Sequence, residues 1–220
     1  MSIYPAWFRA IRAAVKPFFK KLDVQGADNI KEPCVIIARH LNNYGPVAVF
    51  LFTPVEFHLW AYHVFLEKET FYKQFSEYTF PKRMHLPAWL SRALARMLSW
   101  FAPNLLRKIG LLPVYRGMKA VLKTMELSVD ALEKGENVLI LPDVDYVSQS
   151  ENVGKLYTGF VHLGKFYYRR TGKRLLFVPM CVNKAKGVMR IGEGIAYDPS
   201  QPLPEERDRI AAYLQKELEG

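Results

Sequence analysis

The sequence predicts an α/β domain that is preceded by an amphipathic helical segment. Its 220 residues are enough for one domain with a sizeable core. Half of the residues are hydrophobic and 24% are charged, so the chain can bury a core and lacks the composition of a disordered protein. Short apolar runs alternate along the chain with stretches of helical periodicity, which is the pattern of an α/β fold.

The predicted strands are the short apolar runs, and they span residues 34–38, 57–62, 111–115, 137–141, 175–182 and 188–191. The predicted helices between and after them span residues 46–52, 119–133, 158–170 and 204–218. Gly135 follows the second of these helices at the place where a helix-ending glycine is favoured. We expect residues 31–220 to form the α/β domain and residues 1–30 to form the N-terminal helical segment.

The formal net charge of +10 is concentrated in two segments of the chain. Residues 1–22 contain five basic residues and no acid. Residues 82–108 contain six basic residues and no acid, and we predict that they form a basic amphipathic insertion within the domain. Because the charges elsewhere nearly balance, the basic character of the chain belongs to these two segments.

The first basic segment has the pattern of an amphipathic helix. Its apolar residues recur at helical spacing and are Tyr4, Phe8, Ile11, Val15, Phe18, Phe19 and Leu22. Arg9, Arg12 and Lys16 occupy another side of the same helix, and Trp7 lies at its flank. Pro17 predicts a kink near the end of the segment.

The second basic segment also has a broad apolar band, which includes Trp89. Arg92 and Arg96 are one helical turn apart on this segment. Pro87 and Pro103 are placed to bracket a helix between them. The sequence therefore predicts two basic amphipathic helices in the chain.

Each of these helices alone is compatible with ordinary packing on a core, but two together favour binding to a membrane surface. Interfacial aromatic residues enter the headgroup layer, while each Lys or Arg gains about 1 kcal/mol from anionic lipid. A nucleic-acid partner is not expected, since the chain has no helix-turn-helix, zinc-ligand or RNA-binding signature.

The chain has no run of 18 apolar residues free of charge, so we predict no spanning helix. At the N-terminus the cations are interspersed among the apolar residues, which differs from the order in a secretory signal. The expected location is cytoplasmic, with the protein peripheral on the inner face of the membrane.

Four sequence blocks at the ends of predicted strands resemble those of the lysophosphatidate and glycerol-3-phosphate acyltransferase family, in the family's order. Residues 35–45, which contain His40, resemble a strand followed by Asn-His-x4-Asp. Residues 108–117 resemble the Gly-x5-Arg block, 138–146 the Phe-Pro-Glu-Gly-Thr-Arg block, and 177–180 the Val-Pro block. The resemblance covers roughly residues 34–198, and its specificity lies in the order and spacing of the blocks.

This resemblance implies a central mixed sheet flanked by helices. It also implies acyl transfer from a thioester, acyl-CoA or acyl-carrier protein, to the hydroxyl of a lysophospholipid or another acceptor, as in a 1-acylglycerol-3-phosphate O-acyltransferase. No cofactor is expected to be bound. His40 matches the family's general base, which takes the proton of the attacking hydroxyl. The resemblance places substrate contacts at Arg116, Asn43, Gly110 and Tyr146.

The sequence departs from the family pattern at two positions. Gly45 stands where the family has the Asp that orients the histidine, and Tyr146 stands where it has a phosphate-binding arginine. Asp143 and Asp145 add carboxylates in the third block. One hypothesis is that Asp143 or Asp145 lies within about 6 Å of the His40 imidazole and replaces the missing acid. The alternative is that both are turn residues after a strand.

Two functions of different classes remain open at this point. The first is an acyltransferase with His40 as the base, and the second is a non-catalytic relative that binds acyl chains or membrane lipid. A metal site is not expected, because the two carboxylates of the third block are too few ligands. The surroundings of the His40 imidazole discriminate the two functions.

Overall fold

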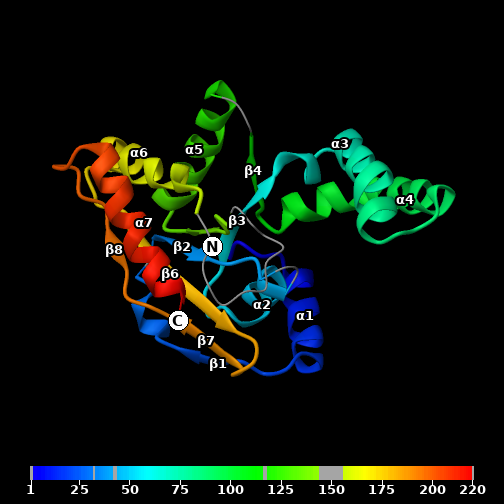
Figure 1. The fold of residues 1–220 in the computed structure, drawn as a ribbon, viewed down its shortest axis with the longest axis horizontal. Helices are drawn as coiled ribbons and strands as arrows, with labels where there is room; N and C mark the ends of the chain where they lie inside the picture. Colours follow the sequence, from blue (N-terminus) through cyan, green and yellow to red (C-terminus); the bar gives the residue numbers. More distant parts are fainter. Residues whose placement is uncertain (1, 32, 42–43, 116–117, 144–155, 220) are drawn as a thin grey trace. The chain divides into compact units, whose positions relative to one another are not determined.

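The chain folds into two compact units (Figure 1). The computed structural model describes residues 2–31, 33–41, 44–115, 118–143 and 156–219. Unit 1 comprises Met1–His58 and Met125–Gly220, and unit 2 comprises Leu59–Thr124. The N-terminal segment is thus grouped with the sheet of unit 1, and unit 2 is larger than the expected insertion at residues 82–108.

Unit 1 is built on a mixed β-sheet. Its strands are β1 (Asp23–Gln25), β2 (Cys34–Ala38), β5 (Asn137–Ile140), β6 (Leu176–Asn183), β7 (Val188–Ile191) and β8 (Ile195–Ala196). They lie in the order β1-β7-β6-β2-β5, and β8 pairs with the beginning of β6. β2 is parallel to both β5 and β6, whereas β7 and β8 are antiparallel to β6. The prediction of a central mixed sheet is confirmed.

The two strands that matter most for the site, β2 and β5, are buried along their whole length. Central parallel strands are covered on both faces, so both sets of alternating side chains are buried. Their sequences are therefore continuous apolar runs. Val35 lies opposite Val138, and Ile37 lies opposite Ile140. Because the strands are parallel, the residues that follow them meet at the same edge of the sheet.

Helices of unit 1 pack against this sheet. They are α1 (Ala6–Val15), α2 (Tyr44–Phe52), α6 (His162–Thr171) and α7 (Leu203–Glu219). α7 packs on β6 through Ile210, Leu214 and Leu218, which have no exposed surface, and α6 lies beside α7 (Figure 1). Helix α5 (Met118–Glu133) continues from unit 2 into unit 1. It ends before Gly135, whose φ of 82° confirms the predicted helix-ending glycine.

The N-terminal segment packs on α2 through aromatic side chains. Tyr4 is buried, and the Phe8 ring lies 5.1 Å from the Tyr4 ring and 5.9 Å from the Phe50 ring, each in an edge-on arrangement. α1 ends at Val15 and continues as a 3-10 turn, Lys16–Phe18, that contains Pro17. Phe8 is thereby half-buried, whereas most residues of α1 remain exposed.

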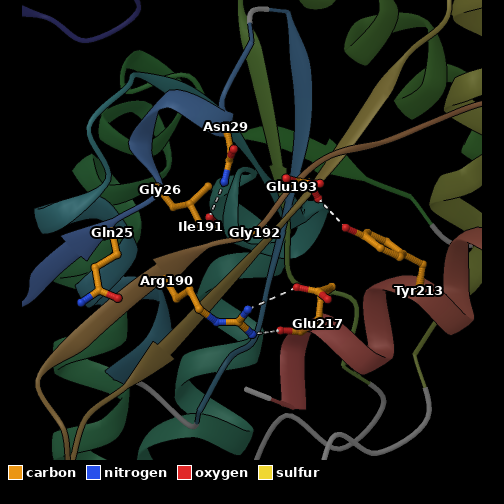
Figure 2. A pocket seen from close by; sticks show the side chains of 9 residues that line it. All are labelled: Gln25, Gly26, Asn29, Arg190, Ile191, Gly192, Glu193, Tyr213 and Glu217. Atoms are coloured by element: carbon orange, nitrogen blue, oxygen red, sulfur yellow. Dashed lines mark hydrogen bonds and ion pairs between the residues drawn. The ribbon is translucent and has the colours of Figure 1, made fainter.

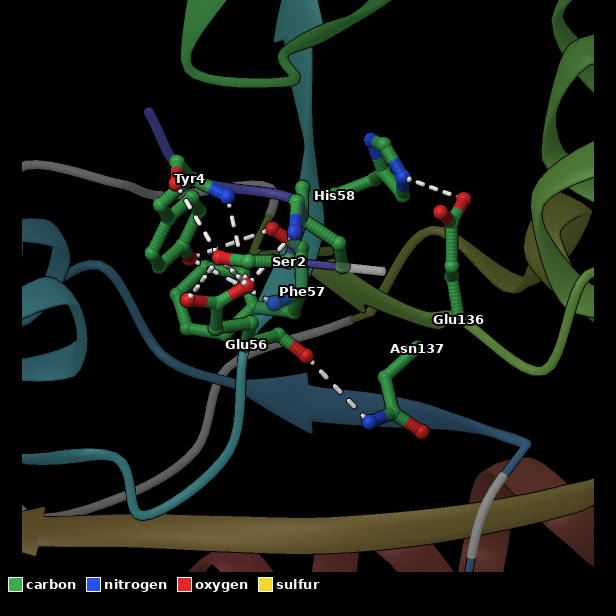
Figure 3. A network of polar contacts seen from close by, with 8 residues as sticks. Ser2, Tyr4, Glu56, Phe57, His58, Glu136 and Asn137 are labelled. Atoms are coloured by element: carbon green, nitrogen blue, oxygen red, sulfur yellow. Dashed lines mark hydrogen bonds and ion pairs between the residues drawn. The ribbon is translucent and has the colours of Figure 1, made fainter. Parts of the chain in front are cut away.

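Glu56 fixes the start of the chain to the entrance of strand β3 (Figure 3). Its carboxylate accepts hydrogen bonds from Ser2 Oγ at 2.8 Å, the Ile3 amide at 2.6 Å and the Tyr4 amide at 3.2 Å. The Tyr4 hydroxyl donates to the Phe57 carbonyl at 3.1 Å, and burial raises the pKa of Tyr4. These contacts hold the segment that leads into α1 against unit 1.

Unit 2 is mainly helical. It contains most of β3 (Phe57–Tyr62), β4 (Leu112–Val114), α3 (Lys68–Lys73), the π-helix η4 (Gln74–Arg83) and α4 (Ala88–Lys108). β3 and β4 pair in parallel, with Trp60 opposite Leu112. Both α3 and η4 pack on α4. Neither was predicted, since their charged sequence shows no clear helical periodicity.

Helix α4 buries small residues and exposes large apolar ones. Ser91, Ala95, Ser99 and Pro103, each one turn from the next, form its buried stripe. Pro87 is the N-cap as predicted, but the prediction that Pro103 ends the helix is wrong, because α4 continues through it to Lys108. The large exposed side chains are Trp89, Met97, Trp100, Phe101 and Leu105.

No helix within the described residues is long and apolar enough to cross a bilayer.

Candidate active site

His40 lies in a tight turn between the buried strand β2 and helix α2. β2 ends at Ala38, and α2 begins at Tyr44. Leu41 adopts a φ of 44°, a left-handed conformation that costs a non-glycine residue on the order of 1–3 kcal/mol. The Gly45 amide donates to the His40 carbonyl at 2.8 Å and closes the turn. This turn presents His40 at the carboxyl edge of the sheet.

The same turn explains why position 45 carries no acid. A Cβ atom added to Gly45 would collide with the backbone carbonyl oxygens of Arg39 and His40. Backbone atoms of a turn that joins a buried strand to a helix cannot move aside cheaply. The backbone therefore excludes any side chain at Gly45, including the aspartate of the family pattern.

A carboxylate reaches His40 from the neighbouring strand instead. The β2–β5 register pairs residues that are 103 apart in number, which places Asp143, just after β5, opposite His40. Asp143 Oδ2 accepts a hydrogen bond from the His40 backbone amide at 2.5 Å and lies 3.0 Å from His40 Nδ1. The carboxylate that the sequence hypothesis required near His40 is thus present, and it belongs to Asp143.

This contact determines the electronic state of the imidazole. A carboxylate accepts hydrogen bonds, so it favours the tautomer of His40 that carries its proton on Nδ1. The lone pair of the neutral ring is then on Nε2. The Asp143 side chain is 11% exposed, whereas that of His40 is 31% exposed. The arrangement combines a shielded carboxylate with a more exposed imidazole.

Arg39 adds a cation to this pair. Its guanidinium Nε lies 3.8 Å from Asp143 Oδ1, and the side chain is 8% exposed. Asp143 therefore has the imidazole at one oxygen and a buried guanidinium near the other. Buried charges need a compensating charge, and the Arg39 guanidinium and the Asp143 carboxylate compensate each other. Arg39 was not predicted as a site residue; the available signal in the sequence was a charged residue directly after a wholly apolar strand.

The structure places Gly110 in unit 2. Gly110 has a φ of 81° and donates its amide to the Arg107 carbonyl at 3.0 Å, so it ends helix α4. The other substrate-contact candidates, Asn43, Arg116 and Tyr146, lie outside the described residues, as does Asp145.

The candidates for membrane binding in unit 1 differ in their surroundings. Arg9 is exposed, and Trp7 is half-buried with its ring 5.7 Å from that of Phe8. The Lys16 ammonium lies over the Phe52 ring at 5.2 Å. The Arg12 guanidinium donates to carbonyl oxygens at the end of α2, including that of residue 53 at 2.6 Å. Arg12 therefore caps α2, and this contact explains its position without lipid.

A pocket of about 360 Å³ lies elsewhere in unit 1 (Figure 2). Its polar lining groups pair with one another: Arg190 contacts the Glu217 carboxylate at 3.2 Å, and the Tyr213 hydroxyl donates to the Glu193 carbonyl at 2.9 Å. β6 separates β7, which carries Arg190, from β2. The pocket contains neither member of the His–Asp pair, and its polar lining does not suit an acyl chain.

Comparison with known proteins supports the fold. No protein-family model matches the sequence, and no curated protein matches it. Among solved structures, the chain is similar to the 1-acyl-sn-glycerophosphate (LPA) acyltransferase PlsC from Thermotoga maritima, with a TM-score of 0.52 and 11% identity. The match covers 96% of this chain and 80% of that chain. The chain thus has the α/β fold of a glycerolipid acyltransferase, as the four sequence blocks predicted.

Proposed function

We propose that this chain is an acyltransferase that uses His40 as its general base. The acyl group moves from a thioester, acyl-CoA or acyl-carrier protein, to the hydroxyl of a lysophospholipid or another acceptor. The observation that carries the proposal is the Asp143 carboxylate, 3.0 Å from Nδ1 of an imidazole that keeps 31% of its side-chain surface exposed. A general base needs both a partner that orients the ring and a ring nitrogen that the substrate can reach. The fold shared with PlsC supports the same reaction class.

The proposed reaction uses Nε2 of His40 twice. Nε2 takes the proton of the acceptor hydroxyl as the hydroxyl oxygen attacks the thioester carbonyl carbon. The resulting tetrahedral intermediate collapses, the carbon–sulfur bond breaks, and the departing thiolate receives the proton from Nε2. Asp143 stabilises the imidazolium that exists between these two transfers, since its carboxylate lies against Nδ1. Arg39 is a positioning residue that acts on Asp143.

The site is proposed to work on a membrane surface that contains anionic lipids, with the protein peripheral on the cytoplasmic face. In unit 1, Ile11, Val15, Phe18 and Phe19 are exposed, and the Phe18 side chain is 90% exposed. Soluble monomers rarely leave such residues together in water. The segment that holds them carries basic residues and no acid. This combination suits the headgroup layer of an anionic bilayer.

Helix α4 of unit 2 supports the same surface association. Trp89 is 72% exposed and Trp100 is 74% exposed, and the exposed Arg92 and Arg96 lie on the same helix. The buried stripe of α4 consists of small residues, so its largest apolar side chains are the ones left for lipid.

Replacing both Trp89 and Trp100 with alanine is expected to weaken binding to vesicles by about tenfold, because two interfacial indoles lose their apolar contact with lipid. Co-sedimentation with vesicles of phosphatidylglycerol and phosphatidylcholine measures the effect. Tyr168→Ala, which removes a partly exposed aromatic ring from α6, is the control and should bind like the wild type. Unchanged binding of the double variant would contradict the role of α4.

The reaction itself is tested on liposomes that contain a panel of hydroxyl acceptors, with acyl-CoA or acyl-carrier protein as donor. His40→Ala is expected to lower kcat by about 10²- to 10⁴-fold, the usual contribution of a general base. His162→Ala is the matched control, since His162 is half-buried and its hydrogen bond within the described residues is to the Gly159 carbonyl of its own turn. Equal transfer by His40→Ala and wild type would reject the base, and no transfer by the wild type would favour a lipid-binding role.

A further inference from the structure

The hairpin between β6 and β7 presents lysines on a rigid turn. The Gly187 amide donates to the Asn183 carbonyl at 2.9 Å, and the Lys186 amide donates to Asn183 Oδ1 at 2.9 Å. Gly187 has a φ of 69°, which a glycine adopts without strain. Lys184 and Lys186 are exposed on this turn. The backbone of the turn is thus fixed while the two ammonium groups remain available to a ligand.

This hairpin lies at the same edge of the sheet as His40. β6 is the parallel neighbour of β2, with Met180 opposite Ala38, so the residues after each strand emerge at one edge. The Lys184 ammonium lies over the Tyr44 ring, 5.0 Å from its centroid. Tyr44 is the first residue of α2, four positions after His40. The contact therefore holds a cation beside the turn that carries the proposed base.

The charges around Lys184 favour an anionic ligand. Burial raises the pKa of the Tyr44 phenol, so the ring beneath the ammonium stays neutral. The Lys20 ammonium donates to the Ala185 carbonyl at 3.4 Å, which brings a second cation to the turn. Among the described residues, no carboxylate forms an ion pair with Lys184. The turn is therefore a positively charged surface next to the site.

We infer that Lys184, held over Tyr44, binds a phosphate group of the substrate beside His40. The inference rests on the proposed acyl transfer. In the family pattern an arginine binds phosphate, and Tyr146 stands in its place, so another residue must supply the positive charge. A cation on the β6–β7 hairpin supplies the missing charge from a different element. Phosphate is present both in a lysophospholipid headgroup and in the pantetheine-linked carrier of the donor, so either can be the group that Lys184 binds.

Binding of dodecyl phosphate, below its micelle concentration, tests this subsite without requiring catalysis. Isothermal titration calorimetry is expected to show binding to the wild type, and Lys184→Ala should weaken it about tenfold through loss of a charge-assisted contact. Lys184→Arg should bind within about threefold of the wild type, because a guanidinium also carries the charge, binds phosphate and lies over an aromatic ring. Lys173→Ala is the matched control, since Lys173 is an exposed lysine that precedes β6 at its other end.

Competition identifies the source of the phosphate. If sn-glycerol 3-phosphate displaces dodecyl phosphate from the wild type, Lys184 serves the acceptor headgroup; if coenzyme A displaces it, Lys184 serves the donor. Either result supports the subsite. Equal affinities of Lys184→Ala and wild type, or no binding by the wild type, would overturn it. If binding of dodecyl phosphate depends on Lys184 but the protein transfers no acyl group, the phosphate subsite is supported and the proposed reaction is rejected. The two proposals can therefore fail separately.

Discussion

An Asp143→Asn variant is expected to lose acyl-transfer turnover by about 10⁴-fold while keeping its fold. The magnitude follows from the serine-protease triad, where neutralising the acid that orients the histidine has an effect of this size. Asparagine can still accept the hydrogen bond of the His40 amide through its oxygen, so the backbone of the turn keeps its partner. It supplies no charge to the imidazolium, however, and no longer enforces a proton on Nδ1. The kcat measured at saturating donor and acceptor reports the effect.

Asp130→Asn is the control for this experiment. Asp130 is a half-exposed carboxylate that pairs with Arg170 at 2.7 Å on the surface of unit 1, and its loss should leave turnover within about twofold of the wild type. The circular dichroism spectrum and melting temperature of both variants establish whether they fold. If folded Asp143→Asn retains turnover within tenfold of the wild type, Asp143 has no role in catalysis and is only a turn residue after β5.

Restoring the family's aspartate by Gly45→Asp is expected to abolish activity instead of raising it. The new Cβ would collide with the carbonyl oxygens of Arg39 and His40, so the turn that positions the base must open. Overpacking of this kind costs about 1–3 kcal/mol of folding free energy. The opened turn also loses the contact between His40 and Asp143, so kcat should fall by at least about 100-fold, the lower end of a general base's contribution. Urea unfolding and the acyl-transfer assay measure the two losses.

Gly159→Asp provides the comparison for Gly45→Asp. A Cβ added to Gly159 has no atom within 4 Å, so the same substitution there should change neither stability nor turnover by a measurable amount. An active and stable Gly45→Asp variant would show that the turn tolerates a side chain, and the steric reason for the missing acid would then be wrong.

The sequence predicted the fold well because the central strands are wholly apolar. Strands β2, β3 and β7 have the predicted bounds, and β5 ends one residue earlier than predicted. Strand β6 is shifted by one residue at both ends, and β4 is one residue shorter at each end. Strands β1 and β8 were missed, since two or three residues are too short to show an alternating pattern. Helix α4 was predicted to end early because Pro103 was assigned the role of a terminator; packing of its small residues on α3 and η4 carries the helix through this proline.

The site was predicted less completely, because its contacts depend on strand register. The block around His40 was recognisable, but the sequence could not decide between Asp143 and Asp145. The pairing of β2 with β5 at an offset of 103 residues places Asp143 opposite His40, and register is a property of the packed sheet, whereas Asp145 lies outside the described residues. Arg39 and Lys184 were missed for the same reason. Arg39 contacts Asp143, and Lys184 contacts Tyr44. Both partners are remote in sequence, so neither contact could be predicted from the sequence.

The central claim, that Asp143 sets the state of the His40 base, is tested most directly by the ¹⁵N NMR spectrum of the imidazole. The resonances of His40 are identified by their absence from the spectrum of His40→Ala. Above the pKa of the ring, the wild type is expected to carry its proton on Nδ1, with Nε2 showing the shift of an unprotonated nitrogen. In Asp143→Asn this preference should be lost. A wild-type His40 protonated on Nε2, or one whose tautomer is unchanged in Asp143→Asn, would contradict the account.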